Sequence, residues 1–198
     1  MSLEEITGAN LGRFACLLFP AGDAHYYSEL SGPVGRGNIR SYVASGGGFI
    51  GFGAGGAFAA TDSGNWPGVG LIPGTTRYPS ASIVPNPYYG MIEIEKGPSP
   101  GLVARGSRYQ SMYRGGPEFF PTNERAVTVD YHYFEVGSAA AIGGEFGIGR
   151  FWVAGFQPEF EEGSARDGTN YGDDLSDIES EWELIDAALN TCITYRNR

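Results

Sequence analysis

The pattern of apolar and polar residues over the first fifty positions predicts a strand, a helix and a second strand. Segment 13–23, RFACLLFPAGD, is a short apolar run that ends at a proline and a glycine, as expected of a buried parallel strand leading into a loop. In segment 38–48 the apolar residues recur on one helical face, with Asn38 as the expected N-cap and Gly46 as the stop signal. The run FIGF, 49–52, is then the next strand. This spacing is typical of a parallel crossover unit.

The pattern beyond this unit predicts short strands between glycine and proline breakers, then one amphipathic helix. We expect the C-terminal helix to begin at a capping box made by Ser176 and Glu179. Its apolar stripe comprises Ile178, Trp182, Ile185, Leu189 and Cys192. The expected strands lie in 69–74, 90–96, 109–120 and 126–136, and a hairpin over 139–156 turns at Gly147 to Gly149.

The composition narrows the class of protein. The chain has 198 residues, 41% of them hydrophobic and 18% charged, which suits a single domain, 1–198. The formal net charge of −10 disfavours nucleic acid and anionic membrane surfaces as partners. No apolar run approaches the roughly 18 residues of a membrane span, and the first residues carry no signal-peptide pattern. We therefore expect a soluble protein, either cytoplasmic or exported with a leader absent from this chain.

Segment 46–60, GGGFIGFGAGGAFAA, contains a sharp strand-to-helix turn centred on Gly53. Turns of this kind, called nucleophile elbows, present a serine or cysteine in many hydrolases and related enzymes. Gly53 has no side chain to present. Glycine does relieve the backbone strain that such a turn imposes on any other residue. The backbone cradle, including the amide of Ala54, is expected to persist as an anion or carbonyl site.

Five motifs in order carry a resemblance to a known family: LLFPAGDAHYY, IRSYVASGGGFIGFGAGGAF, LIPG, YRGGPEFF and GIGRFWVAGFQPEF. Together they resemble the class I glutamine amidotransferase-like domain, most closely the N-terminal domain of fungal-type biotin–protein ligases and related bacterial proteins. The resemblance covers about residues 17–160. It implies an α/β fold, a flavodoxin-like three-layer sandwich with a mostly parallel central sheet, and a Cys-His-Glu triad.

The motifs place the triad's cysteine at Gly53, its histidine at Gln157 and its glutamate at Glu159. Gln157 cannot accept a proton near neutral pH, and Gly53 supplies no nucleophile, so acyl transfer by this route should be absent. Glu159 either accepts a hydrogen bond from the Gln157 amide or caps nearby backbone amides. Two losses favour a naturally inactive domain, a pseudoenzyme, rather than an engineered change.

The resemblance also indicates a pocket for a small carboxylate or amide group between three loops. We expect its lining to include Gly22, His25, Tyr26, Ala54, Gly115, Gly116 and Glu118. One rival function is a hydrolase or transferase that uses His25 or Glu118 with a water; another is a structural or assembly role. Each of those side chains has a plainer interpretation, His25 as a packed loop residue and Glu118 as a solvated turn carboxylate.

No cofactor or metal is expected. The acidic stretch 165–183 fails the EF-hand pattern because Ile178 stands where the closing glutamate is needed. The two cysteines, Cys16 and Cys192, both lie in apolar patterns, which favours buried free thiols over a disulfide.

The start of the chain departs from the family, which has a strand and a helix-linked second strand where this chain has only about 13 residues. The family's first strand–helix unit is thus expected to be missing, which leaves the apolar strand from Phe14 to Phe19 at a sheet edge. An apolar edge is an aggregation hazard, so it must be covered. The candidates are the N-terminal arm, a second subunit in a homodimer, or a segment absent from this chain.

Overall fold

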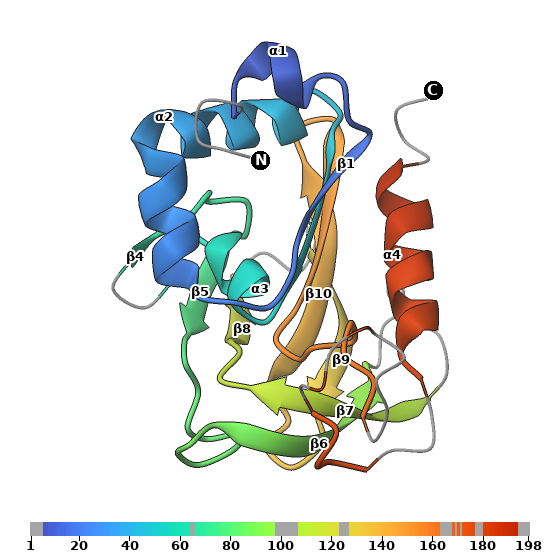
Figure 1. Cartoon of the computed structure of the whole chain (residues 1–198). Helices are drawn as coiled ribbons and strands as arrows, with labels where there is room; N and C mark the ends of the chain where they lie inside the picture. The colour runs from blue at the N-terminus through green and yellow to red at the C-terminus, as the bar shows by residue number, and fades with distance from the viewer. Residues whose placement is uncertain are drawn as a thin grey trace.

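One curled sheet with helices on both faces forms the centre of the protein (Figure 1). This computed structural model confirms the predicted α/β class. Helices α2 (Ala24–Ala44) and α3 (Ala54–Phe58) cover one face, and α4 (Trp182–Ile193) covers the other. The structure describes residues 6–63, 66–97, 107–122, 127–162, 168, 170, 172–176 and 180–193.

Three neighbouring strands make up the part of the sheet that the helices sandwich. Strands β1 (Cys16–Phe19), β2 (Gly48–Phe52) and β11 (Gly149–Ala154) pair in parallel, in the order β1, β2, β11. Helix α2 links the first two, so the predicted crossover unit is confirmed. Every residue of β2 is buried, because it has a neighbour on both sides and helices above and below.

Helix α2 is longer than the sequence pattern predicts, and Asn38 is not its N-cap. The helix begins after Asp23, whose carboxylate accepts a hydrogen bond from the His25 N–H at 2.8 Å. It is interrupted at Gly32, with φ 58° and ψ 179°, directly before Pro33. The chain is already helical again at Asn38, whose side-chain amide instead donates to the Ile6 carbonyl at 2.8 Å.

The rest of the sheet is built from antiparallel pairings. Beyond β11 lie β10 (Ala139–Phe146), β9 (Val127–Tyr133), β6 (Tyr89–Lys96) and β7 (Arg108–Arg114), each antiparallel to the one before it. Strand β8 (Glu118–Pro121) pairs with β10 and with β5 (Gly74–Arg77), also antiparallel. By these pairings β7, β8 and β9 point the same way as the three parallel strands. Most strands of the sheet therefore run in one direction, although among the described residues only two pairs of neighbouring strands, β1 with β2 and β2 with β11, are parallel.

Two predictions for this region differ in outcome. The hairpin is confirmed, since β10 and β11 pair from Phe146 opposite Gly149 onward. The strand predicted over 69–74 is wrong, because this segment folds back on the end of α3. There Val69 and Leu71 donate their N–H groups to the carbonyls of Phe58 and Ala59, both at 2.8 Å. The remaining short elements are α1 (Gly8–Leu11), β3 (Asp62–Ser63) and β4 (Trp66–Pro67).

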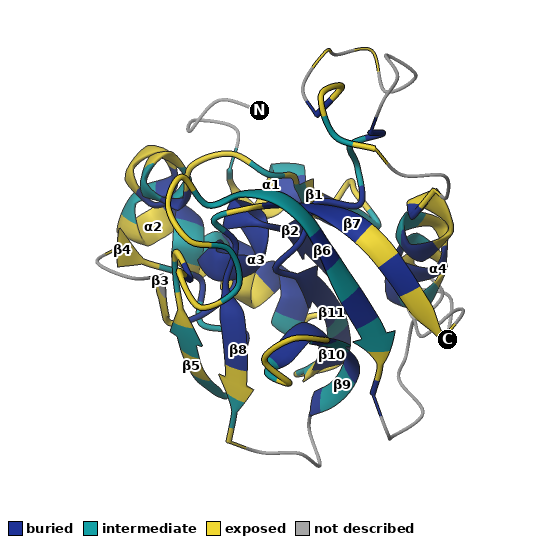
Figure 2. Ribbon diagram, turned by 90° about the horizontal axis from the view of Figure 1, so that it is seen from below, coloured by how far each residue is buried: buried dark blue, intermediate teal, exposed yellow. Residues whose placement is uncertain are grey.

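Two apolar clusters hold the helices to the sheet, and much of the ribbon where helices and sheet meet is buried (Figure 2). On the α4 face, Leu184, Ala187, Ala188 and Cys192 are buried, whereas Trp182 is 46% exposed. The predicted stripe is thus wrong at Trp182. The predicted start at Ser176 is wrong as well, because the helix begins at Trp182, whose N–H donates to the Ser180 hydroxyl at 3.4 Å. Ile178 and Glu179 lie outside the described residues.

Strand β1 lies at the sheet edge, as predicted, and within the described residues it pairs only with β2. Phe14 and Leu18 are 44% and 43% exposed there. A groove of about 390 Å³ runs between this edge, α2 and the N-terminal residues Ile6 and Leu11. Among the described residues, the segment from Ile6 to Leu11 therefore covers the strand only in part.

No helix in the described part of the chain combines the length and hydropathy needed to cross a membrane.

Candidate functional site

The turn between β2 and α3 has the tight geometry that its glycines predict. Gly53 adopts φ 49° and ψ −113°, a left-handed backbone that favours glycine. Its N–H donates to the Ala154 carbonyl at 2.9 Å, and its carbonyl accepts from the Ala57 N–H at 3.0 Å. A Cβ atom on Gly55 would lie 2.0 Å from the Phe19 carbonyl oxygen. The turn is therefore fixed against β1 and β11 and has no room for larger residues.

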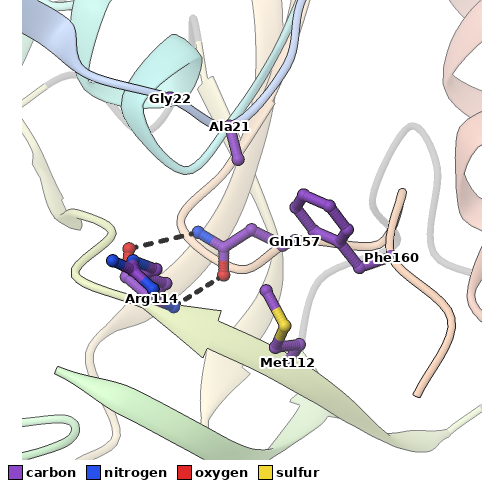
Figure 3. A pocket seen from close by; sticks show the side chains of 6 residues that line it. All are labelled: Ala21, Gly22, Met112, Arg114, Gln157 and Phe160. Carbon is purple, nitrogen blue, oxygen red and sulfur yellow. Dashed lines mark hydrogen bonds between the residues drawn. The ribbon is translucent and has the colours of Figure 1, made fainter. Parts of the chain in front are cut away.

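Gln157 lies opposite this turn. A Cβ atom added to Gly53 would lie 2.4 Å from the Gln157 Nε2 atom. The Gln157 Oε1 atom accepts from the Arg114 N–H at 2.8 Å, and Nε2 donates to the Arg114 carbonyl at 3.4 Å (Figure 3). The buried side chain thus pairs with the end of β7 much as a neighbouring strand would. It fills the space into which a side chain at Gly53 would project.

Glu159 holds the loop that follows β1. Its Oε1 atom accepts from the Ala21 N–H at 2.6 Å, so of the two predicted alternatives the structure shows backbone capping. Its Oε2 atom is inaccessible to solvent and has no hydrogen-bond partner in the described residues. Burial raises the pKa of Glu159 to about 7, against the opposing effect of the Ala21 hydrogen bond. This carboxyl group therefore changes charge near neutral pH.

A pocket of about 240 Å³ opens beside this group, where β1 and β11 end (Figure 3). Open α/β sheets commonly bind ligands outside the carboxyl ends of their parallel strands. Arg114 lies in the lining, with its guanidinium carbon 6.0 Å from the centre of the Tyr89 ring, and Met112 and Phe160 bring apolar surface. The complete lining is Ala21, Gly22, Met112, Arg114, Gln157 and Phe160.

Of the predicted ligand-binding residues, Gly22 alone lines this pocket. His25 and Tyr26 lie on the first turn of α2, where the His25 ring stacks on Trp66 with 3.9 Å between centroids. The His25 Nε2 atom also lies 3.5 Å from the Glu29 carboxylate. His25 is thus packed against its neighbours, although it lies on a helix and not in a loop as its plainer interpretation had it. Ala54 is buried as the first residue of α3, a helix too short to offer an anion site at its N-terminus.

In segment 115–118, GGPE, the two glycines and Glu118 have structural roles. A Cβ atom on Gly116 would lie 1.6 Å from the Gly155 carbonyl oxygen, and Gly115 has φ 56°. The Glu118 side chain is 4% exposed, and its Oε1 atom accepts hydrogen bonds from Arg77 at 3.0 Å, from Ser82 at 2.6 Å and from Ser80. Glu118 is thus neither a solvated carboxylate nor part of the pocket lining.

The charge of Glu118 is stabilised where it lies. Burial on its own raises the pKa of this carboxyl group, but hydrogen bonds from serines and the nearby Arg77 guanidinium outweigh it. The net effect is a pKa below its ordinary value. A carboxylate held ionised and surrounded by donors is a poor general base, since its lone pairs are already engaged.

Besides Ala21 and Met112, the pocket is lined by two residues not expected there from the sequence, Arg114 and Phe160. Both stand inside the motifs that carried the resemblance, Arg114 in YRGGPEFF and Phe160 at the end of QPEF. A search for a positive charge near the pocket loops would have found Arg114. Within the described residues, no three His, Cys, Asp or Glu side chains gather closely enough to hold a metal ion.

Comparisons with known proteins identify the fold of the chain, but they identify neither its family nor its activity. No protein-family profile matches the chain, and no curated protein sequence matches it. A ThuA-like protein from Bacteroides uniformis superposes with a TM-score of 0.58 at 12% identity, covering 96% of this chain and 74% of its own. Cytoplasmic protein STM3548 from Salmonella typhimurium gives 0.56 at 14% identity, covering 94% and 74%. PurLQS from Thermotoga maritima gives 0.54 at 14% identity, covering 89% and 79%.

These likenesses support the amidotransferase-like fold that the ordered motifs predict. At such low identity they show shared architecture only, and activity has to be argued from the site itself.

Proposed function

We propose that the chain is a catalytically degenerate amidotransferase-like domain that binds a small carboxylate or amide ligand in the pocket beside Gln157. The main support for the proposal is the position of the Gln157 side-chain amide. It lies where a nucleophile at Gly53 would project, and the Arg114 backbone engages both of its polar atoms. In this proposal the Gly53 turn is a nucleophile elbow that has lost its nucleophile.

The chemistry of the remaining groups argues against acyl transfer. A covalent route needs a thiolate or an activated hydroxyl beside a base, and neither Gly53 nor Gln157 offers one. The rival residues are engaged elsewhere, His25 with Trp66 and Glu29, and Glu118 with Arg77 and serines. Loss of triad members typically reduces turnover by about 10⁴-fold or more. Binding is the function that these groups retain.

The pocket lining indicates the ligand class. Arg114 suits a carboxylate, because a guanidinium pairs with it through two parallel hydrogen bonds. Met112 and Phe160 suit a short apolar portion next to that group. The narrower likeness to the biotin–protein ligase N-terminal domain belongs to the same proposal, since the motifs that suggested it contain both Arg114 and Gln157.

A ligand panel tests the proposal. Acetate, glutarate and N-acetylglycine are titrated by calorimetry alongside their amide counterparts. We expect at least one carboxylate to bind and Arg114→Gln to weaken it by about 10-fold or more, the usual effect of losing a charge-assisted hydrogen bond. Arg108→Gln is the matched control, since Arg108 lies on the same strand and pairs with Glu93 and Glu95, away from the pocket lining.

Two results would contradict the proposal. One is the absence of binding by every member of the panel, and the other is equal weakening by the Arg108 and Arg114 variants. Release of ammonia from glutamine above the blank rate would contradict the degenerate character and support an enzyme instead.

A second candidate role is assembly through the edge of β1. The observation in its favour is that Phe14 and Leu18 are exposed beside backbone that pairs on one side only, within the described residues. Such an edge favours pairing with another strand, and a second copy of the chain in a homodimer would supply one.

A further inference from the structure

The two cysteines of the chain face each other across Gly48. The β1–β2 register places Cys16 directly beside Gly48, and Cys192 reaches the same position from α4. A Cβ atom on Gly48 would lie 3.1 Å from the Cys16 Sγ atom and 2.9 Å from the Cys192 Cβ atom. The missing side chain of Gly48 therefore creates the space in which the two thiols meet. Both cysteines are free in this structure, as expected from the sequence, but only Cys192 is buried as predicted, whereas Cys16 is partly exposed.

The closeness of the two thiols also affects their chemistry. The neighbouring Cys16 thiol and, after it, burial raise the pKa of Cys192 well above its usual range. Arg150, which lies beside Gly48 on β11, opposes this by favouring the thiolate. A cation near a thiol pair aids disulfide chemistry, because the thiolate is the attacking species.

The two thiols differ in access. Cys16 is partly exposed and lines the groove of about 390 Å³ beside the β1 edge, so a small reagent can reach it. Cys192 is buried, with its Sγ atom 3.8 Å from the Phe49 carbonyl oxygen. Cys16 is thus suited to react first with an external reagent, and Cys192 to displace that reagent from within the protein.

We propose that Cys16 and Cys192 form a reversible intramolecular disulfide that ties the edge strand β1 to helix α4. The oxidant is a small-molecule disulfide, RSSR. The Cys16 thiolate attacks one of its sulfur atoms, which forms a mixed disulfide and releases RS⁻. The Cys192 thiolate then attacks the Cys16 sulfur and releases the second RS⁻. Two protein thiols are oxidised, RSSR is reduced to two RSH, and the two protein protons end on the released thiolates.

The disulfide would join β1 to α4, which are far apart in the sequence, and β1 leads into the candidate pocket. Strand β1 leads through Pro20 into Ala21 and Gly22, which line the candidate pocket. Residues 16 and 192 enclose most of the chain, and closing a long loop reduces the entropy of the unfolded state. Oxidation should therefore stabilise the fold and restrain the strand on which the pocket loop depends. The proposal stands independently of which ligand the pocket binds.

To test the proposal, the reduced protein is incubated with oxidised glutathione at pH 8. Its intact mass is then measured by mass spectrometry under denaturing conditions. We expect a monomer that has lost two hydrogens, retains no glutathione and has no titratable thiol. Its Tm should rise by about 5 to 15 °C, and dithiothreitol should reverse the rise. In Cys192→Ser, Cys16 can still form the mixed disulfide, but no second thiol can displace glutathione. Glutathione should therefore remain attached at Cys16.

Cys16→Ser provides the matched control, because it leaves only the buried Cys192. That variant should gain glutathione at least 10-fold more slowly than Cys192→Ser gains it at Cys16. The proposal is overturned if the wild-type protein ends with glutathione attached, forms only disulfides between molecules, or keeps both thiols while Cys192→Ser reacts. Because the decisive measurement uses the wild-type chain, a variant that folds poorly does not remove the test.

Discussion

The amide of Gln157 lies where a side chain on Gly53 would project, 2.4 Å from the position of its Cβ atom. The two residues are far apart in sequence yet jointly define the site, because one leaves a space and the other fills it. A side chain at Gly53 would therefore require Gln157 to move, and Gln157 is held by the backbone of Arg114. The glycine at position 53 and the place of the Gln157 amide thus depend on each other.

A side chain at Gly53 should accordingly destabilise the fold. We expect Gly53→Ala to lower the free energy of unfolding by about 2–4 kcal/mol, from backbone strain at positive φ and from overlap with Gln157. Urea unfolding measures this. Gly37→Ala is the control, since its Cβ meets nothing within 4 Å and alanine suits a helix.

A double-mutant cycle separates the two causes of that loss. Gln157→Ala removes the overlap but leaves the strain, so the double variant Gly53→Ala with Gln157→Ala should lose less stability than the two single changes added together. Strict additivity would show that the two side chains do not compete for one space.

Glu159 should make stability depend on pH in an unusual direction. Its folded-state pKa of about 7 lies above the ordinary value of a glutamate, so between about pH 4.5 and 7 the folded protein binds more protons than the unfolded chain. Its contribution to stability therefore falls as pH rises through this window. The decrease is at most about 3 kcal/mol by pH 8.

The test compares the unfolding free energy of the wild type and of Glu159→Gln between pH 4.5 and 8. A glutamine still accepts the Ala21 hydrogen bond but cannot ionise, so the variant should gain stability relative to the wild type as pH rises. Glu135→Gln, an exposed change in the turn before β10, should leave the pH profile unaltered. A constant difference between wild type and Glu159→Gln would contradict the assignment.

The local sequence predicted the crossover unit and the Gly53 turn because both depend on short-range signals. It missed the first half of α2 for a physical reason. The buried face there consists of Ala24, Ser28, Ser31 and Gly35, which are all small and include no large apolar side chain. Their helical spacing is invisible to a search for hydrophobic residues. Gly32 and Pro33 reinforced the error, since they are read as breakers and here mark only a kink.

The site was harder to predict than the fold because its contacts join distant segments. The motifs identified Gln157 and Glu159, but no local pattern reveals that Gln157 bonds the Arg114 backbone or that Glu159 caps Ala21. The partners of Glu118 are equally remote in the sequence, since Arg77 ends strand β5 and Ser80 lies in the segment that follows it. A sequence motif shows which residue types are present, but the contacts of each residue depend on how the whole chain folds.

The β1 edge yields the last prediction, a homodimer in which two copies pair along this strand. Its exposed Phe14 and Leu18 favour association, whereas the net charge of −10 on each copy opposes it. Added salt screens the repulsion, so the dimer fraction should rise between 0.02 and about 0.3 M sodium chloride. Sedimentation velocity measures it directly. Leu18→Lys should abolish the dimer, and Val136→Lys, equally exposed but located at the turn after β9, should not. A chain that stays monomeric at every salt concentration, or loses its dimer equally in both variants, would show that β1 is not the interface.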